Sequence, residues 1–364
     1  MRLRYGTNPH QPSTISPVHP DHSPIRLISG EPSYINILDA VGAWQLVQEA
    51  STAFDRPAAA SFKHVSPAGA ALAGSVDAAI STTYGIEPAG GSVTSAYVRA
   101  RDADPKSSYG DFVAVSHPVD AELGGFLQRL ACDGIIAPGY DPDVVGKLSA
   151  KKHGTFLVLE ADNDFRPPTE EIREIYGLRL TQRRDDLPLT RASLGEPVVG
   201  TLTAAAIDDL LLGMIVMRYT QSNSVGYVRD GMAIGIGAGQ QSRIDCTSLA
   251  GAKADTWWLR RHPDVLADSD RAELKLQERI ARQLRHLADS LTPTERQAWL
   301  SRLTDVALVS DGAIPFRDNI DEAHRHGVRY IAEPGGSLRS HEVAAACREF
   351  GIALTQTGIR LFRH

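Results

Sequence analysis

The stretch "VALVSDGAIPFRDNIDEAHRHGVRYIAEPGGSLRSHEVAAACREFGIALTQ", residues 306–356, decides the fold class. Its short apolar runs at 306–310, 328–333 and 352–356 alternate with two more polar segments, at about 317–327 and 341–350. Short strands that alternate with helices of about ten residues are typical of α/β proteins with a largely parallel sheet. The stretch therefore predicts a layered α/β fold.

The same kind of strand recurs toward the N-terminus. The apolar runs "AAASFKHV" (58–65), "DFVAVS" (111–116), "DGIIAPGY" (133–140) and "DGMAIGIGAG" (230–239) are each bounded by turn residues. Short apolar runs between turn signals are typical of buried strands. We therefore expect the sheet to extend over most of the chain.

Five helices are predicted from spacing and capping residues. Residues 38–50 and 242–261 have helical patterns, and Leu276, Ile280, Leu284 and Leu287 form one apolar stripe. Thr292–Glu295 has the pattern of a capping box. Ser66 followed by Pro67 matches an N-cap and a first helical position, so a helix is expected after Lys63 and His64.

Composition excludes several classes of protein. The chain has 364 residues, of which 42% are hydrophobic and 23% charged, and this predicts a globular protein of two or three units. The net charge of −6 argues against a nucleic-acid partner. No apolar run approaches the roughly 18 residues that a membrane span needs, and the N-terminus lacks the apolar core of a signal peptide.

The cysteines indicate a reducing compartment. Cys132, Cys246 and Cys347 are widely separated and form no C-x-x-C pair. Such a set is expected to remain as free thiols rather than to form disulfides or a zinc site. We therefore expect a cytoplasmic protein.

Four common catalytic motifs do not occur. "GIGAGQQ" (235–241) has a glutamine where a dinucleotide-binding loop needs its third glycine, which argues against NAD. The chain has no phosphate-binding G-x-x-x-x-G-K-[ST] loop for ATP and no G-x-S-x-G elbow of a hydrolase. It also lacks the H-x-E and P-C-x-x-C pair of zinc deaminases.

Lys63 and His64 are the strongest candidates for catalytic residues. They lie where a predicted buried strand ends and a predicted helix begins, and ligands of α/β sheets collect at the carboxyl ends of strands. Two adjacent strand residues point to opposite faces, so both can reach one ligand only if the chain bends there. From these residues alone, a pair on the surface remains the alternative to a proton-handling site.

Long polar blocks accompany this pair. They are "RYGTNPHQ" (4–11), "FKHVSPAGAA" (62–71), "YVRARDADPKSSYGDFVAVS" (97–116), "CDGIIAPGY" (132–140), "YTQSNSVGYVRDGMAIGIGAGQQSRIDCTSLAGAKADTWWLRRHP" (219–263), "PFRDNIDEAHRHGVRYIAEPGGS" (315–337) and "GIRLFRH" (358–364). In their order, these blocks resemble the aminoimidazole carboxamide ribonucleotide (AICAR) transformylase half of the bifunctional purine biosynthesis family. The resemblance covers residues 4–364.

The resemblance implies a fold and a division of the chain. The family fold has two cytidine-deaminase-like α/β/α units and a smaller connecting subdomain, without zinc. On this sequence the implied units are 1–167, 168–259 with the folate and nucleotide loops, and 260–364. The cyclohydrolase half of the family would precede this region, so we expect no such activity here and a separate inosine monophosphate cyclohydrolase downstream.

The resemblance also implies the reaction, which is formyl transfer from 10-formyltetrahydrofolate to the 5-amino group of AICAR. His64 matches the general base, and Lys63 the residue that stabilises the oxyanion or protonates the leaving folate nitrogen. The positive charge of Lys63 would favour a neutral His64 imidazole. Asn223 matches the residue that binds the formyl oxygen. No zinc, NAD or ATP is implied.

Further positions follow from the same matches. Nucleotide positions fall at Arg4, Tyr5, Gly110, Asp133, Arg243, Asp318, Ser337, Arg360 and His364, and folate positions at Asn223, Ile244, Pro315 and Phe316. The resemblance places a potassium ion near Thr220, Ser222, Ser224 and Asp311, and it implies a homodimer with shared active sites. Without the family, Arg4 is equally a solvated terminal charge, and Asp318 a carboxylate favoured by a helix dipole.

The sequence departs from the family pattern at five positions. Ala313 and Ile314 stand where two phenylalanines are usual, and Asp245, Gly358 and Arg363 replace other residues. None of these removes a catalytic group, but together they change the expected pocket. Two alternatives therefore remain, a formyltransferase for a related aminoimidazole nucleotide in a specialised pathway and a non-catalytic nucleotide-binding paralogue.

Overall fold

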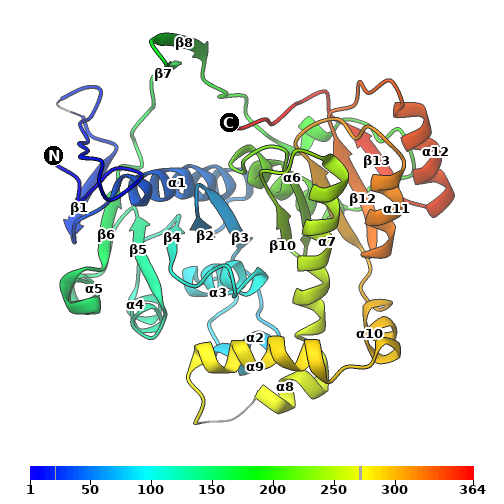
Figure 1. Ribbon diagram of the computed structural model, residues 1–364, viewed down its shortest axis with the longest axis horizontal. Coiled ribbons are helices and arrows are strands. Elements are labelled where there is room, and N and C mark those ends of the chain that lie inside the picture. The colour runs from blue at the N-terminus through cyan, green and yellow to red at the C-terminus, as the bar shows by residue number, and fades with distance from the viewer. Residues whose placement is uncertain (21, 270–272) are drawn as a thin grey trace.

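The computed structural model describes residues 1–20, 22–269 and 273–364 (Figure 1). Its main sheet contains β1 (Ile25–Ser29), β2 (Ala58–Lys63), β3 (Ser66–Leu72), β4 (Asp111–Val115), β5 (Cys132–Ala137), β6 (Leu157–Ala161), β9 (Val225–Arg229), β10 (Met232–Gly237), β11 (Val306–Ser310), β12 (Val328–Glu333) and β13 (Ala353–Gln356). The helices are α1 (Tyr34–Phe54), α2 (Ala78–Tyr84), α3 (Val93–Ala103), α4 (Ala121–Gln128), α5 (Pro142–Ala150), α6 (Ala204–Arg218), α7 (Arg243–Leu259), α8 (Pro263–Ser269), α9 (Leu276–Asp289), α10 (Pro293–Leu300), α11 (Asp318–Arg325) and α12 (Ser340–Phe350), with 3₁₀ turns at Lys151–Gly154 and Arg191–Leu194.

The strands form one mixed sheet in the order β1-β6-β5-β4-β2-β3-β10-β9-β11-β12-β13. Pairing is parallel along β4-β5-β6 and along β11-β12-β13. The central strands β4, β2, β3, β10, β9 and β11 pair antiparallel, as do β1 and β6. The predicted α/β class is confirmed, and parallel pairing occurs where helices connect successive strands.

The sheet is built from two repeats with the same order of elements. When α2 is left out, the first repeat runs α1-β2-β3-α3-β4-α4-β5-α5-β6, and when α8, α9 and α10 are left out, the second runs α6-β9-β10-α7-β11-α11-β12-α12-β13. The two repeats meet where β3 and β10 pair antiparallel, with Ala71 opposite Met232. The second repeat begins at Ala204, so the predicted boundary between 259 and 260 does not coincide with the repeat.

Helices cover both faces of the sheet. On one face, α1 and α6 pack on strand residues such as Ala60 and Phe62. On the other face, α3, α4, α5, α7, α11 and α12 pack on residues such as Val113 and Ile135. Alternate residues of a strand point to opposite faces, and apolar residues on both faces therefore bury the sheet between two layers.

Most predicted local signals are confirmed. Residues 38–50 lie in α1, and α7 and α9 fall on their predicted ranges. Thr292 accepts from the Glu295 N–H and the Glu295 side chain accepts from the Thr292 N–H, so α10 begins with the predicted capping box. Cys132, Cys246 and Cys347 are buried free thiols.

The helix predicted to begin at Ser66 is wrong. Ser66–Leu72 is strand β3, which pairs with β2 on one side and β10 on the other, and the next helix begins only at Ala78. A Ser-Pro pair satisfies the local requirements of a helix start, but the flanking apolar residues are buried between two strands. Tertiary pairing therefore overrides the local signal.

A hairpin of β7 (Glu170–Ile175) and β8 (Leu178–Arg183) stands away from the main sheet and its helices (Figure 1). We call residues 170–183 the arm, and the rest of the molecule the body. Nearly all of the arm's residues are exposed, and these include the large apolar side chains of Ile172, Ile175, Tyr176, Leu178 and Leu180. The arm lies within a charged, proline-bearing segment, residues 165–193.

Among the described residues, the structure has no helix long and apolar enough for a membrane span.

Candidate active site

Lys63 and His64 lie at the tip of the β2–β3 hairpin. His64 and Val65 form its two-residue turn, and both have positive φ angles, 53° and 64°. Two left-handed residues match the right-handed twist of a hairpin, but glycine and asparagine normally occupy such positions. The bend required between Lys63 and His64 is therefore made by this turn. The sequence predicted a helix start at this point, and that prediction is wrong.

The carboxylate of Asp39 holds this turn from α1. The Val65 N–H donates to Asp39 Oδ1 at 2.6 Å. Burial raises the pKa of Asp39, and this effect is partly offset by the hydrogen bond from Val65 and by the nearby His64. Sequence reasoning missed Asp39, because a single carboxylate in a helical pattern gives no local sign of the turn that it contacts.

Lys63 lies beside two other predicted site residues. Its Nζ donates to the Tyr109 carbonyl. Gly110 follows in a left-handed conformation with φ 73°, and a Cβ there would lie 3.8 Å from Lys63 Nζ and 3.9 Å from both carboxylate oxygens of Asp133. Asp133 also forms an ion pair with Lys152 at 2.7 Å. The structure thus brings Lys63, Gly110 and Asp133 together.

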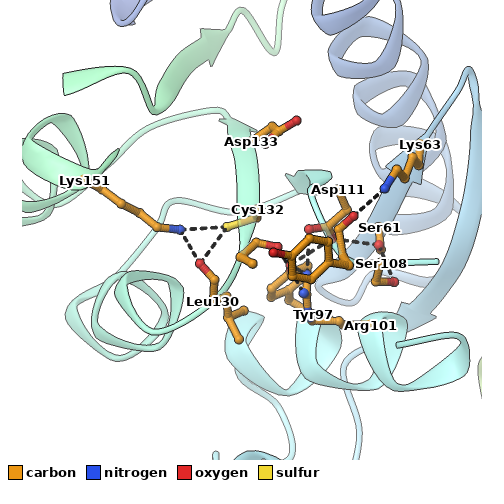
Figure 2. A network of polar contacts seen from close by, with 12 residues as sticks. Ser61, Lys63, Tyr97, Arg101, Ser108, Asp111, Leu130, Cys132, Asp133 and Lys151 are labelled. Atoms are coloured by element: carbon orange, nitrogen blue, oxygen red, sulfur yellow. Dashed lines mark hydrogen bonds and ion pairs between the residues drawn. The ribbon is translucent and has the colours of Figure 1, made fainter. Parts of the chain in front are cut away.

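A buried ion pair supports the loop that carries Tyr109 and Gly110 (Figure 2). Arg101 Nη1 and Asp111 Oδ1 are 2.6 Å apart, and both side chains are 0% exposed. Asp111 also accepts from the hydroxyls of Ser61 and Tyr97, at 2.7 and 3.0 Å. Buried charges are stable only when paired and hydrogen-bonded, so these contacts fix the backbone below Lys63.

The strand that carries Asp133 is also anchored by a lysine. Lys151 Nζ donates to the Leu130 carbonyl at 2.8 Å and lies 3.0 Å from the buried Cys132 Sγ (Figure 2). The ammonium also lies 4.4 Å from the centre of the Phe156 ring. These contacts hold the start of β5 in place, and Asp133 follows Cys132 directly.

A second group of predicted residues surrounds Asn223. Its Oδ1 accepts from Arg243 Nη2 at 2.9 Å, and its Nδ2 donates to the Gln241 carbonyl at 3.1 Å. An amide nitrogen has two donors. The second Asn223 donor has no partner among the described residues and is available to a ligand oxygen.

Arg243 also forms a buried ion pair with Asp311. The carboxylate of Asp311 accepts in addition from the Ser222 hydroxyl at 2.6 Å and the Ser224 N–H at 3.0 Å. Of the four residues predicted to lie near potassium, Thr220 donates to the Val216 carbonyl, and Ser224 Oγ is buried without a partner in the described part of the chain. The oxygens suit a monovalent cation, but Arg243 already neutralises Asp311.

The C-terminal segment lies against this second group. The Leu361 N–H donates to the Asp311 carbonyl at 2.8 Å, and Arg363 and Ser222 exchange two hydrogen bonds of 3.0 Å. The Arg360 guanidinium lies 4.7 Å from the Phe362 ring centre. The His364 carbonyl accepts from Arg173 of the arm. Arg360 and His364 are exposed and lie on the side of the arm.

A cavity of 410 Å³ lies beside the first group and reaches the loop that leads to Asn223. Its polar lining residues are Lys63, His64, Ser66, Ser107, Gln221 and Lys253, and apolar residues from β3, α7 and the end of β10 complete it. The Gln221 N–H donates to Ser66 Oγ at 3.3 Å, and Gln221 is two residues from Asn223. The hairpin turn of the first repeat thus lies next to the loop that opens β9 in the second.

Other predicted residues lie around this region without a direct contact to Lys63 or Asn223 in the described structure. Arg4 Nη2 donates to the Tyr5 hydroxyl at 3.0 Å, and both residues pack at the start of α1. Asp318 begins α11, and Ser337 follows β12. Pro315 and Phe316 precede α11, and Ile244 lies in the first turn of α7.

Three of the sequence departures have structural explanations. Ile314 is 2% exposed and belongs to the core, so it is not a pocket wall. Gly358 has a φ of 69°, a conformation that glycine and asparagine both adopt readily. The Arg363 guanidinium lies 5.4 Å from the Tyr219 ring centre. Ala313 is half-buried and Asp245 is exposed, and nothing in the structure explains these two.

The arrangement can perform a group transfer. It places an imidazole, an ammonium and an amide donor at one edge of the sheet, and these groups accept a proton, stabilise an oxyanion and bind a carbonyl oxygen. The guanidinium groups of Arg4 and Arg360 are exposed and suit a phosphate. The fold and the site together define an α/β protein with a candidate active site at one edge of its sheet.

Comparison with known proteins assigns the family. The model of the AICARFT/IMPCHase bienzyme family matches residues 1–253, and the chain belongs to this family. Over its whole length the chain is 31% identical to the bifunctional purine biosynthesis protein PurH of Ruegeria pomeroyi and 32% identical to that of Rhodospirillum rubrum. It spans 59% of the length of each of these relatives.

Proposed function

We propose that this protein transfers a formyl group from 10-formyltetrahydrofolate to the 5-amino group of AICAR, and so forms the formylated nucleotide of purine biosynthesis. One observation carries the proposal. The Lys63–His64 turn of one repeat lies beside the loop of the other repeat that leads to Asn223, because Lys63, His64 and Gln221 line one cavity and the Gln221 N–H donates to Ser66 Oγ. Membership of the family supports the same reaction.

The reaction needs a base because the AICAR amine is conjugated with the ring and is a weak nucleophile. The amine nitrogen attacks the formyl carbon while His64 accepts the proton that leaves the amine. The second N–H of Asn223 binds the formyl oxygen, and the Lys63 ammonium stabilises the negative charge that develops there. The bond between formyl carbon and folate nitrogen then breaks, and that nitrogen takes a proton from Lys63.

Nucleotide binding is assigned to the surrounding charged residues. Arg4, Tyr5 and Arg360 bind the phosphate, and Gly110, Asp133, Arg243, Asp318, Ser337 and His364 complete the nucleotide site. Ile244, Pro315 and Phe316 bind the folate with Asn223. Thr220, Ser222, Ser224 and Asp311 hold potassium. Ser224 Oγ supports this assignment, because it is a buried oxygen with no partner among the described residues.

The active protein is proposed to be a cytoplasmic homodimer with shared active sites. The arm supports this proposal because it exposes five large apolar side chains away from the body. A cavity of 1750 Å³ between the arm, α1 and α6 offers room for a segment of a second copy, and Arg360 and His364 border it. The two repeats are proposed to be the cytidine-deaminase-like units of the family, at Tyr34–Ala161 and Ala204–Gln356.

The test is a turnover assay with purified protein, AICAR and 10-formyltetrahydrofolate, in which the release of tetrahydrofolate is followed by absorbance. We expect turnover by the native protein and at least about a hundredfold less by a His64→Ala variant. The absence of turnover with native protein would overturn the proposal. Calorimetric titration with AICAR runs in parallel, and binding without turnover would instead support a nucleotide-binding paralogue.

A further inference from the structure

The turn at His64 and Val65 has an unfavourable sequence for its conformation. Both residues are left-handed, and Val65 is β-branched. A left-handed conformation costs a residue with a side chain about 1–2 kcal/mol, and glycine or asparagine normally avoids this cost. Something outside the hairpin must therefore stabilise the turn. The one side chain that accepts a backbone hydrogen bond from it, within the described chain, is that of Asp39.

The second repeat contains the equivalent contact. Asp230 and Gly231 form the β9–β10 turn with φ angles of 52° and 71°. Asp209 of α6 accepts from the Asp230 N–H at 2.9 Å and from the Gly231 N–H at 2.7 Å. Asp39 and Asp209 occupy the same place in α1 and α6, because each is the sixth residue after its N-cap, Ser33 or Thr203.

The two turns lie at opposite ends of the sheet. β3 and β10 are antiparallel, and β10 begins beside the end of β3, where Ala71 faces Met232. Turn 64–65 therefore lies next to the candidate active site, whereas turn 230–231 contacts Arg99 of α3 at the other end. Asp209 supports a sequence that already favours the turn, and Asp39 supports one that does not.

We propose that Asp39 is a positioning residue for the transfer, because its carboxylate holds the left-handed turn that presents the His64 imidazole and the Lys63 ammonium to one substrate. This inference rests on the proposed function. In a continued strand the two side chains would point to opposite faces. With the turn in place, Lys63 lies beside Gly110 and Asp133, and both Lys63 and His64 border the same cavity.

The experiment compares Asp39→Ala, Asp39→Asn and Asp209→Ala in the turnover assay. We expect Asp39→Ala to lower kcat at least about tenfold with less than a threefold change in the KM for AICAR. Asp39→Asn keeps one acceptor oxygen for the Val65 N–H, so it is expected to restore kcat to within about threefold of native. Asp209→Ala is expected to lower the melting temperature without changing kcat.

A glycine at position 65 provides a second variant. Glycine adopts the left-handed conformation without strain. In the Val65→Gly background, the fold-decrease in kcat on removal of the Asp39 carboxylate is therefore expected to be less than a third of the fold-decrease seen with valine at position 65. The proposal would be overturned if removal of the Asp39 carboxylate lowered kcat equally with valine and with glycine at position 65. It would also be overturned if a folded Asp39→Ala variant kept native kcat, or if Asp209→Ala lowered kcat as much as Asp39→Ala does.

A readout independent of turnover separates this inference from the proposed function. The ring signal of His64 is assigned by NMR from its disappearance in His64→Ala. We expect the signal to shift and broaden in Asp39→Ala and to remain in place in Asp39→Asn and Asp209→Ala. If native protein shows no turnover, the proposed function fails, and an unchanged His64 signal in Asp39→Ala would overturn the positioning role separately.

Discussion

The two hairpins at the centre of the sheet have the same topology and different chemistry. The β9–β10 turn has the sequence Asp230-Gly231, which suits two left-handed residues, and the β2–β3 turn has His64-Val65, which does not. Tyr227 of the second hairpin belongs to the apolar core, whereas Ser61 of the first contacts a buried ion pair. One repeat therefore uses the hairpin for stability, and the other gives up stability to place two titratable groups.

The largest expected effect is on the buried ion pair below the first hairpin. Asp111→Ala leaves Arg101 buried and uncompensated, and we expect it to lower the free energy of unfolding by about 3–5 kcal/mol in denaturant titrations. A double variant, Arg101→Met with Asp111→Leu, removes both charges and is expected to recover most of this loss. If the single variant lowers the free energy of unfolding by less than about 1 kcal/mol, the buried ion pair does not distinguish the first hairpin from the second.

The next effect is on turnover. His64→Ala removes the proposed base and is expected to lower kcat by about a hundredfold or more, which corresponds to about 2.7 kcal/mol of activation free energy. Asp230→Ala, the matched change in the other turn, is expected to leave kcat within about twofold. Comparable losses in kcat for both variants would show that the two turns do not differ in function.

A pH dependence is expected for the turn that Asp209 supports. Burial raises the pKa of Asp209 to about 6. A carboxyl with a raised pKa stabilises the fold in its protonated form, so its contribution is present at about pH 4 and is lost as the pH rises through 6. We expect the advantage of native protein over Asp209→Ala in free energy of unfolding to fall by about 2 kcal/mol between pH 4 and 7. A pH-independent difference would contradict this expectation.

The smallest effect is expected from exchanging the turn residues. A Cβ at position 231 meets no atom closer than 3.7 Å, so Gly231→Val is expected to cost at least the backbone strain, about 1–2 kcal/mol. Val65→Gly is expected to raise the free energy of unfolding by about 0.5 kcal/mol, since relief of strain exceeds the loss of chain entropy. Thermal melts of the two variants check both signs, and a stabilising Gly231→Val would contradict the strain argument.

Sequence patterns predicted the layers of this fold better than its centre. The segment 306–356 and the Thr292 capping box depend on contacts close in sequence, and both are confirmed. Ser66-Pro67 satisfied a local rule, but β3 is fixed by partners far away in the chain, β10 among them. The repeat was not visible either, because the two halves share an order of elements rather than a periodic sequence.

The sequence named several residues that the structure brings together at the candidate site, but it did not identify the residue that supports them. Lys63, Gly110 and Asp133 were named and lie together, as do Asn223 and Arg243. Asp39 was not named, because its role depends on a turn whose φ angles the sequence does not reveal. A helix carboxylate that contacts a distant backbone N–H can be recognised only once the hairpin is in place.

The junction of β3 and β10 also bears on how the chain could be divided. At this junction, one edge of β3 and one edge of β10 are paired only with the other repeat. A half of the chain expressed alone would expose its edge unpaired, and such edges promote aggregation. The two repeats share a topology, but each is expected to stay soluble only when it is paired with the other. A split protein would therefore be recovered only when both halves are produced together.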